Sequence, residues 1–293
     1  MDGILNIYKE AGYTSHDVVA KLRGMLHQKK IGHTGTLDPD AVGVLPICLG
    51  KATKVCDLLT EKDKIYRAKL LLGTVTDTQD ISGQVIKTGE LCCDLTEQNI
   101  FLVIQSFVGE YDQIPPMYSA LKVQGKRLYD LARAGLVVER KPRRVQIMEI
   151  SDLIISMEEK TVDFTVHCSK GTYIRTLCYD IGEKLGCGAC MKSLQRIQTG
   201  SFKIENAFKL AQIEQKVQNN TLEEILIPID RMFSHIPKCI VEEEELEKLL
   251  LNGNPLHLPF QGEKLRIYHK NGQFAAIYKW REEKHLYFPE KMF

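Results

Sequence analysis

The chain has 293 residues, of which 44% are hydrophobic and 26% are charged, as in an ordinary globular protein. Its formal net charge of +1 excludes a global electrostatic attraction to nucleic acid, so any basic surface must be local. The nine cysteines are odd in number and irregularly spaced, which excludes a secreted disulfide framework and indicates reduced thiols in a cytoplasm.

The first predicted elements are a strand and a helix. Residues 3–13 alternate enough to form a strand that ends at Gly12. Thr14 and Ser15 then offer an N-cap to a helix. The apolar stripe of this helix consists of Val18, Val19, Leu22, Met25 and Leu26.

Residues 32–54 form the most informative stretch. Their density of glycine and proline predicts tight turns, and Pro39 steers Asp38 into extended geometry. An apolar run at 42–49 follows, and residues 50–54 then begin a helix. Asp38 has two interpretations, an Asx-type turn that accepts backbone amides or a carboxylate held as a nucleophile or base. Spacing alone does not separate them.

The middle of the chain alternates strands and helices. Residues 64–73 predict a strand, on which Tyr66 fits a core position with its hydroxyl at one end. A polar connection at 73–83 precedes another short strand. Thr96 caps a following helix, which Gly109 is expected to stop.

Residues 113–144 are strongly basic. Eight lysines and arginines stand among few acids, with Tyr118 and Tyr129 interleaved. Charge runs are usually solvated faces. In an otherwise balanced chain this excess of cations favours an element that faces phosphates.

Residues 162–168 predict another strand, and the turn at 170–172 leads into a helix. Arg175 lies in the first turn of that helix, where the helix dipole disfavours a cation, so a specific acidic partner is expected. Cys187 and Cys190 lack a second Cys or His pair at zinc-finger spacing and are interpreted as buried thiols.

After Pro228 the sequence predicts a smaller unit. Residues 242–245 begin a helix that ends at Gly253, and residues 265–280 form a hairpin around Asn271 and Gly272. About 60 residues is small for an independent domain, so this unit is expected to pack on the first. No apolar run in the chain reaches the roughly 18 residues of a membrane span.

The 32–54 string, GHTGTLDPDAVGVLPICLGKATK, resembles the signature of the TruB family of tRNA pseudouridine synthases at more than twenty consecutive positions. Further blocks extend the likeness over most of the chain: K-x-Y-x-x-x-x-x-L-G, P-P-x-Y-S-A-L-K-x-x-G-x-R-x-Y, G-T-Y-I-R-T-L and S-L-x-R-x-x-x-G-x-F. The opening block departs from the family at Glu10, where proline usually follows Lys9.

The resemblance implies an α+β pseudouridine synthase fold with a mixed, largely antiparallel sheet. The catalytic domain would span residues 1–233, with 113–144 as an insertion that grips RNA. Residues 234–293 would form a small PUA-like β-barrel domain that binds RNA.

The resemblance also assigns roles to particular residues. Asp38 would be the catalytic nucleophile, Arg175 its partner, and Tyr66 the aromatic residue that stacks on the target base. The implied contacts to the RNA substrate are His33, Tyr173, Leu194, Lys122, Arg127 and Arg143.

The implied reaction isomerises uridine to pseudouridine at position 55, in the T loop of tRNA, on a flipped-out nucleotide. It requires no cofactor and no metal, and the expected partner is the T-arm of tRNA, with no guide RNA, no obligatory protein partner and a monomeric state. Residue types leave open whether the carboxylate adds to the ring or assists elimination at C2′. They also leave open whether Asp38 or Tyr66 removes the C5 proton.

Two other classes of function remain open at this point. An RNA N-glycosidase generally employs two carboxylates, for which Asp40 is a conceivable second acid. A non-catalytic protein that binds or folds tRNA would not depend on Asp38 for its activity.

Overall fold

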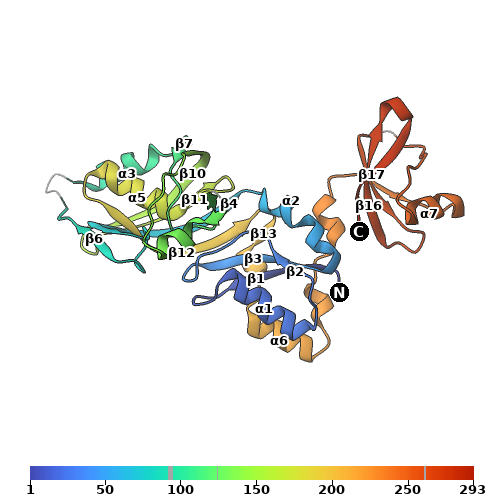
Figure 1. The fold of residues 1–293 in the computed structure, drawn as a ribbon, viewed down its shortest axis with the longest axis horizontal. Helices are drawn as coiled ribbons and strands as arrows, with labels where there is room; N and C mark the ends of the chain where they lie inside the picture. Colours follow the sequence, from blue (N-terminus) through green and yellow to red (C-terminus); the bar gives the residue numbers. More distant parts are fainter. Residues whose placement is uncertain (92–94, 124, 261) are drawn as a thin grey trace.

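The computed structural model describes residues 1–91, 95–123, 125–260 and 262–293, without the side chains of Lys122 and Arg127. Figure 1 shows three parts in a row along the longest axis. Two of them share one large sheet, and the third is a small C-terminal unit.

The large sheet has nine strands: β1 (Gly3–Lys9), β2 (Ile31–His33), β3 (Val42–Leu49), β4 (Lys64–Leu72), β7 (Gly109–Gln113), β10 (Arg143–Ser156), β11 (Thr161–Cys168), β12 (Ala189–Thr199) and β13 (Phe202–Lys203). The helices around it are α1 (Ser15–Leu26), α2 (Cys56–Thr60), α3 (Glu97–Gln105), α5 (Ile174–Leu185) and α6 (Leu210–Gln218). Short 3₁₀ helices are η1 (Gly50–Val55), η2 (Ile204–Asn206), η3 (Leu222–Ile225) and η4 (Ile229–Phe233).

Two small hairpins extend from the body. They are β5 (Thr74–Thr76) with β6 (Val85–Thr88), and β8 (Lys122–Val123) with β9 (Lys126–Arg127), which α4 (Leu128–Arg133) follows. The C-terminal unit contains β14 (Lys238–Ile240), α7 (Glu244–Leu251), β15 (Lys264–Tyr268), β16 (Phe274–Arg281), η5 (Glu282–Lys284) and β17 (Leu286–Met292).

The strand order of the large sheet is β1-β3-β12-β4-β11-β10-β7. Among the described pairs of this sheet, β3 with β12 is parallel and the others are antiparallel, which confirms a mixed, largely antiparallel sheet. The parallel contact is made at Gly43, where φ is +107° and an added Cβ would lie 2.2 Å from the carbonyl oxygen of Arg196. Only glycine fits this junction without a shift of the backbone.

Each half of the sheet has its own core. Helices α1 and α6 cover one face of the β1–β3 half, while α3 and α5 cover the β4, β10, β11 and β12 half (Figure 1). The predicted stripe of α1 is confirmed, since Val18, Val19 and Leu22 are buried. The predicted cap is also confirmed, because Thr14 and Asp17 form a reciprocal capping box.

Three sequence predictions require correction. The first strand ends at Lys9 rather than Gly12. The helix that Thr96 caps ends at Gln105, and Gly109 instead begins β7, because the chain turns at residues 106–108 to pair with β10. The polar connection at 73–83 contains a strand, β5, since Val75 is buried although its neighbours are polar.

The C-terminal unit packs on the body, as expected from its size. Phe233 from η4 contacts Phe274 and Phe293, with ring centroids 6.1 and 5.9 Å away. The predicted helix and hairpin of this unit are confirmed as α7 and as β15 with β16. Its described strands form a four-stranded sheet in the order β14-β15-β16-β17, and the PUA-like barrel stays a prediction. In the described residues, no helix is long and apolar enough to cross a membrane.

Lys9, the last residue of β1, holds the loop between β2 and β3 in place. Its side chain is fully buried, and its ammonium donates to the carbonyl oxygens of Pro39 at 2.8 Å, Ala41 at 2.6 Å and Glu10 at 3.2 Å. Burial lowers the pKa of Lys9 to about 8, against the opposing attraction of Asp38. A buried cation thus fixes the backbone on both sides of Asp40, two residues beyond Asp38.

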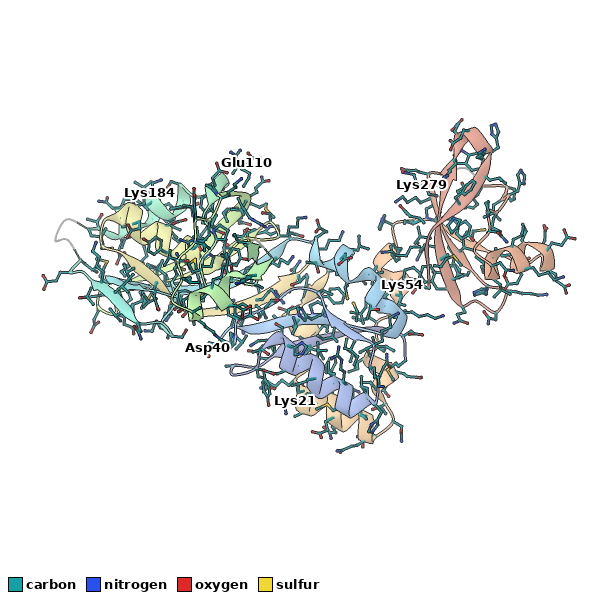
Figure 2. All side chains as sticks on the ribbon, viewed as in Figure 1. Lys21, Asp40, Lys54, Glu110, Lys184 and Lys279 are labelled. Carbon is teal, nitrogen blue, oxygen red and sulfur yellow. The ribbon has the colours of Figure 1, made fainter. Side chains whose placement is uncertain are left out.

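We predict that Lys9→Met lowers the free energy of unfolding by about 2–3 kcal/mol at pH 7, because three carbonyls lose a charged donor. The pKa of Lys9 is lower in the folded protein than in the unfolded chain, so between about pH 8 and 10.5 the folded wild type binds fewer protons than the unfolded wild type. The free energy of unfolding of the wild type, relative to that of the variant, therefore rises with pH in this range. Urea unfolding at pH 7 and pH 9.5 measures both effects. Lys21→Met, on the exposed face of α1 (Figure 2), is the control; it loses one exposed cation–π contact with Tyr13 at 5.2 Å and is expected to change stability by less than about 1 kcal/mol. A pH-independent difference between wild type and Lys9→Met would contradict the prediction.

Candidate active site

Asp38 and Arg175 form a two-point ion pair between the two halves of the sheet. Asp38 lies in the loop between β2 and β3, and Arg175 lies in the first turn of α5. Arg175 Nε lies 2.9 Å from Asp38 Oδ2, and Nη2 donates to Oδ1 at 3.2 Å. The acidic partner predicted for Arg175 is therefore present. The Asx-turn interpretation of Asp38 is wrong, because among the described residues its carboxylate accepts from Arg175 and from no backbone amide.

The guanidinium of Arg175 contacts several other protein groups besides Asp38. It also donates to the carbonyl oxygens of Thr78 at 3.0 Å and Tyr118 at 2.7 Å. The carboxylate of Asp80 lies 3.6 Å from its Nη1. The Arg175 side chain is only 6% exposed, so these partners compensate its removal from water. One arginine thereby fixes the positions of three segments around Asp38.

Gln113 fixes the start of α5. Its side-chain amide is buried, accepts from the backbone N–H of Tyr173 at 2.7 Å and donates to the Tyr173 carbonyl at 3.0 Å. Tyr173 is the N-cap residue of α5, so this double contact sets the direction from which Arg175 reaches Asp38.

A cavity of about 510 Å³ opens beside the ion pair, within the usual range of about 300–1,000 Å³ for ligand sites. Among the described residues that line it, Asp38 is the one carboxylate, and its side chain is 39% exposed. The cationic residues of the lining are Lys64, Arg143, Arg144, Lys170, Arg175 and Arg196. The cavity thus contains one carboxylate among six cationic side chains, and this excess of positive charge suits an anionic ligand such as RNA.

Three of the predicted contact residues line this cavity together. Tyr66 lies on β4, Leu194 on the neighbouring β12, and Tyr173 at the start of α5. Tyr66 and Leu194 are each 8% exposed. Burial raises the pKa values of both tyrosines above the ordinary value, so both phenols are neutral at neutral pH.

The other predicted contacts have different outcomes. Arg143 lines the cavity at the start of β10. The side chains of Lys122 and Arg127 lie outside the described part of the structure. His33, at the end of β2, is outside the cavity lining; its Nδ1 accepts the N–H of Gly35 at 3.3 Å, and burial lowers its pKa.

Asp40 lies apart from the reactive cavity. Figure 2 labels its side chain at the junction of the two halves, where it is exposed and absent from the cavity lining. In the described residues no group of three or more His, Cys, Asp or Glu side chains is placed to hold a metal ion. Cys187 and Cys190 are both buried, as predicted.

Sequence reasoning gave no role to two buried cations of the cavity. Lys64 donates to the carbonyl oxygen of Thr60 at 2.6 Å, and burial lowers its pKa to about 8. Arg196 donates to the carbonyl oxygens of Val44 at 2.7 Å and Gly35 at 3.1 Å, which supports the loop before Asp38. Neither cation stands out in the sequence, because β4 also contains Arg67 and Lys69, and β12 also contains Lys192 and Gln195.

The environment of Asp38 shifts its acidity. Burial raises the pKa of this carboxyl above its usual value, and the Asp80 charge adds to the shift. The charges of Arg175 and Lys9 oppose it. The two-point contact with Arg175 uses one lone pair on each oxygen and leaves the others for a ligand.

Known proteins resemble this chain over its whole length. A family profile described as TruB family pseudouridylate synthase (N terminal domain) matches residues 23–174, and one described as tRNA pseudouridylate synthase B C-terminal domain matches residues 175–234. A tRNA pseudouridine synthase B from Lachnoclostridium phytofermentans is 52% identical over 100% of both chains. The protein of that name from Bacillus subtilis is 43% identical, over 95% of this chain and 93% of its own.

Solved structures share the fold. A chain of an H/ACA RNP bound to a substrate RNA containing 2′-deoxyuridine is 26% identical, with a TM-score of 0.69 over 99% of this chain and 84% of its own. A chain of a Cbf5-Nop10-Gar1 complex is 27% identical, with a TM-score of 0.70 over the same shares. The fold is thus that of the pseudouridine synthases, and with full-length relatives above 40% identity the chain belongs to the TruB family.

Proposed function

We propose that this protein is a tRNA pseudouridine synthase, which isomerises uridine to pseudouridine at position 55 in the T loop. Asp38 acts as the nucleophile. The observation that carries the proposal is a single carboxylate, aimed by Arg175 into a cavity that has apolar and aromatic walls and a cationic rim. The curated relatives named tRNA pseudouridine synthase B support the choice of substrate.

The walls of the cavity suit a nucleotide that has left its stack. Extrusion costs a few kcal/mol, which stacking and edge contacts in the pocket repay. Tyr66 offers a ring for stacking and Leu194 an apolar wall next to it. Arg143 has no hydrogen-bonding or ionic partner among the described residues, so its charge is available to a phosphate; Arg144 instead pairs with Asp112 at 2.8 Å.

The wider assembly follows from the same proposal. The catalytic domain spans residues 1–233, and its basic segment 113–144 grips the T-arm. Residues 234–293 act as a PUA-like RNA-binding domain. The protein works as a monomer on tRNA without a guide RNA or an obligatory protein partner, and His33, Lys122 and Arg127 contribute further RNA contacts.

An N-glycosidase is less well supported. Glycoside hydrolysis generally uses two carboxyl groups about 5–9.5 Å apart across the scissile bond. Among the described residues that line the cavity Asp38 is the one carboxylate, since Asp80 contacts Arg175 and, like Asp40, lies outside the lining.

The proposed function is tested with a tRNA transcript tritiated at uracil C5. We expect wild type to release tritium and Asp38→Asn to lose at least about 10³-fold of the rate, as expected for removal of an essential nucleophile, while tRNA binding is kept. Asp40→Asn is the matched control and should retain activity, because Asp40 lies outside the cavity lining. Absence of release by wild type, with tight tRNA binding, would leave an RNA-binding protein instead. Free uracil that still carries its tritium would instead indicate hydrolysis, because hydrolysis of the glycosidic bond leaves the C5–H bond intact.

The pH dependence of the single-turnover rate tests the role of Arg175. The reactive form is the ionised carboxylate, so activity falls as pH drops through the pKa of Asp38, which burial places above 3.8. Arg175 opposes that shift, and Arg175→Gln should therefore move the acid limb to higher pH as well as slow the reaction. Arg144→Gln removes a cavity cation that pairs with Glu110 and Asp112 and should leave the limb in place. An unmoved limb in Arg175→Gln would show that Asp38 ionisation does not control the rate.

A further inference from the structure

The turn at residues 78–80 holds one nitrogen of the Arg175 guanidinium. The carbonyl oxygen of Thr78 accepts from Arg175 Nη1 at 3.0 Å, and a carboxylate oxygen of Asp80 lies 3.6 Å from the same nitrogen. The other two nitrogens, Nε and Nη2, contact Asp38. Because a guanidinium is planar and rigid, the groups that hold Nη1 also set the directions in which Nε and Nη2 donate. The turn therefore affects how Arg175 meets the carboxylate of Asp38.

Gln79, in the middle of this turn, has a backbone conformation that residues with a side chain rarely adopt. Its φ is +64°, in the left-handed region, which costs free energy for any residue with a Cβ. Its N–H donates to the carbonyl oxygen of Thr76 at 3.2 Å, which closes the turn. The Thr78 carbonyl before it and the Asp80 carboxylate after it thereby reach the same nitrogen of Arg175. A left-handed residue of this kind persists only where the surrounding contacts determine it.

Two further contacts hold Gln79. Its carbonyl oxygen accepts from the backbone N–H of Met191, on β12, at 2.9 Å. Its side-chain Oε1 accepts from the hydroxyl of Thr176 at 2.8 Å. Thr176 is 2% exposed and directly follows Arg175 in α5. The neighbour of Arg175 in the helix therefore binds the central residue of the turn that binds Arg175.

The two side-chain contacts between α5 and the turn are parallel. Arg175 with Thr78 and Thr176 with Gln79 are each 97 positions apart in the chain. A threonine hydroxyl in a helix commonly donates to a carbonyl one turn earlier, whereas that of Thr176 leaves its helix for a distant partner. A single contact would allow the turn to rotate about it, and two adjacent contacts fix its orientation as well as its position.

We propose that Thr176 and Gln79 are positioning residues, which hold the 78–80 turn so that Arg175 presents Nε and Nη2 to Asp38. Neither Thr176 nor Gln79 lines the cavity, so both act through Arg175 and not through the ligand. The inference deepens the proposed function, on which it rests for the role of Asp38 as nucleophile.

The first test measures the orientation of Arg175 without RNA. In protein with ¹⁵N-labelled arginine, the Nε–H of Arg175 is identified by its loss in Arg175→Gln, and it should exchange slowly with water because it is buried against Asp38. We expect Thr176→Val, which keeps the branched shape but lacks the hydroxyl, to speed this exchange by about tenfold, as for the loss of one hydrogen bond. Thr176→Ser keeps the hydroxyl and should keep the protection.

Thr199→Val is the matched control for this experiment. Thr199 is 1% exposed, and its hydroxyl has no hydrogen-bond partner among the described residues. The same substitution therefore removes a buried hydroxyl that holds nothing in place. It should leave the exchange of the Arg175 Nε–H unchanged.

The second test measures the rate of tritium release in a single turnover at saturating tRNA. We expect Thr176→Val and Gln79→Met each to slow release by about tenfold, with tRNA affinity unchanged. Because both variants break the same hydrogen bond, the double variant should be no slower than either single variant. In an Arg175→Gln background, Thr176→Val should cause no further loss, since the group that it positions is absent.

Two results would overturn the inference. The first is unchanged exchange of the Arg175 Nε–H in Thr176→Val. The second is an equal loss of rate by Thr176→Val in wild type and in Arg175→Gln, because a structural role unrelated to Arg175 would slow both alike. The exchange experiment needs no substrate, so failure of the inference is distinguishable from absence of tritium release by wild type, which would overturn the proposed function.

Discussion

The ion pair between Asp38 and Arg175 is the constraint on which the site depends. The two residues are 137 positions apart in the chain and come from different halves of the sheet. A buried arginine in the first turn of a helix is unfavourable by both desolvation and dipole. Two carboxylates and two carbonyls offset that cost here, and in doing so they bring the loops at 35–41, 77–80 and 117–119 to one place. The pair is therefore best understood as a positioning device and not as a source of stability.

The charges of this protein are concentrated locally, and the net charge of the chain does not reveal them. The chain is nearly neutral, yet six cations and one carboxylate line the cavity among the described residues. Some of these cations are neutralised from outside, as Lys170 is by Glu61 and Arg144 by Glu110 and Asp112. Lys64 and Arg196 are instead compensated by carbonyl oxygens. A net charge of +1 is therefore compatible with a strongly positive cavity lining.

Much of the fold could be predicted because its signals are local. The alternation in β4 and the capping box of α1 repeat over a few residues, and burial follows them closely. Asp38 could be predicted from the match to the family motif. Arg175 could be predicted because it is a cation in the first turn of a helix, where the helix dipole disfavours positive charge. The parts that escaped prediction are those that depend on distant partners. Nothing near Lys64 in the chain indicates a buried cation, since its burial arises only when separate segments close the cavity. For the same reason the position of His33 outside the lining could not be predicted from its motif.

The parallel contact between β3 and β12 has a consequence for how the protein is made. Val44 and Arg196, joined by a hydrogen bond across this contact, are 152 positions apart. At about 5–20 residues per second, roughly 8–30 s separate their synthesis on the ribosome. Throughout that interval β1 can pair with one edge of β3 and β2 with the end of the other edge, but the start of β3, at Val42 and Gly43, lacks its partner. Such an unpaired edge can recruit foreign strands. β12 also brings Arg196, which supports the loop before Asp38, so this support is missing until residue 196 has been translated.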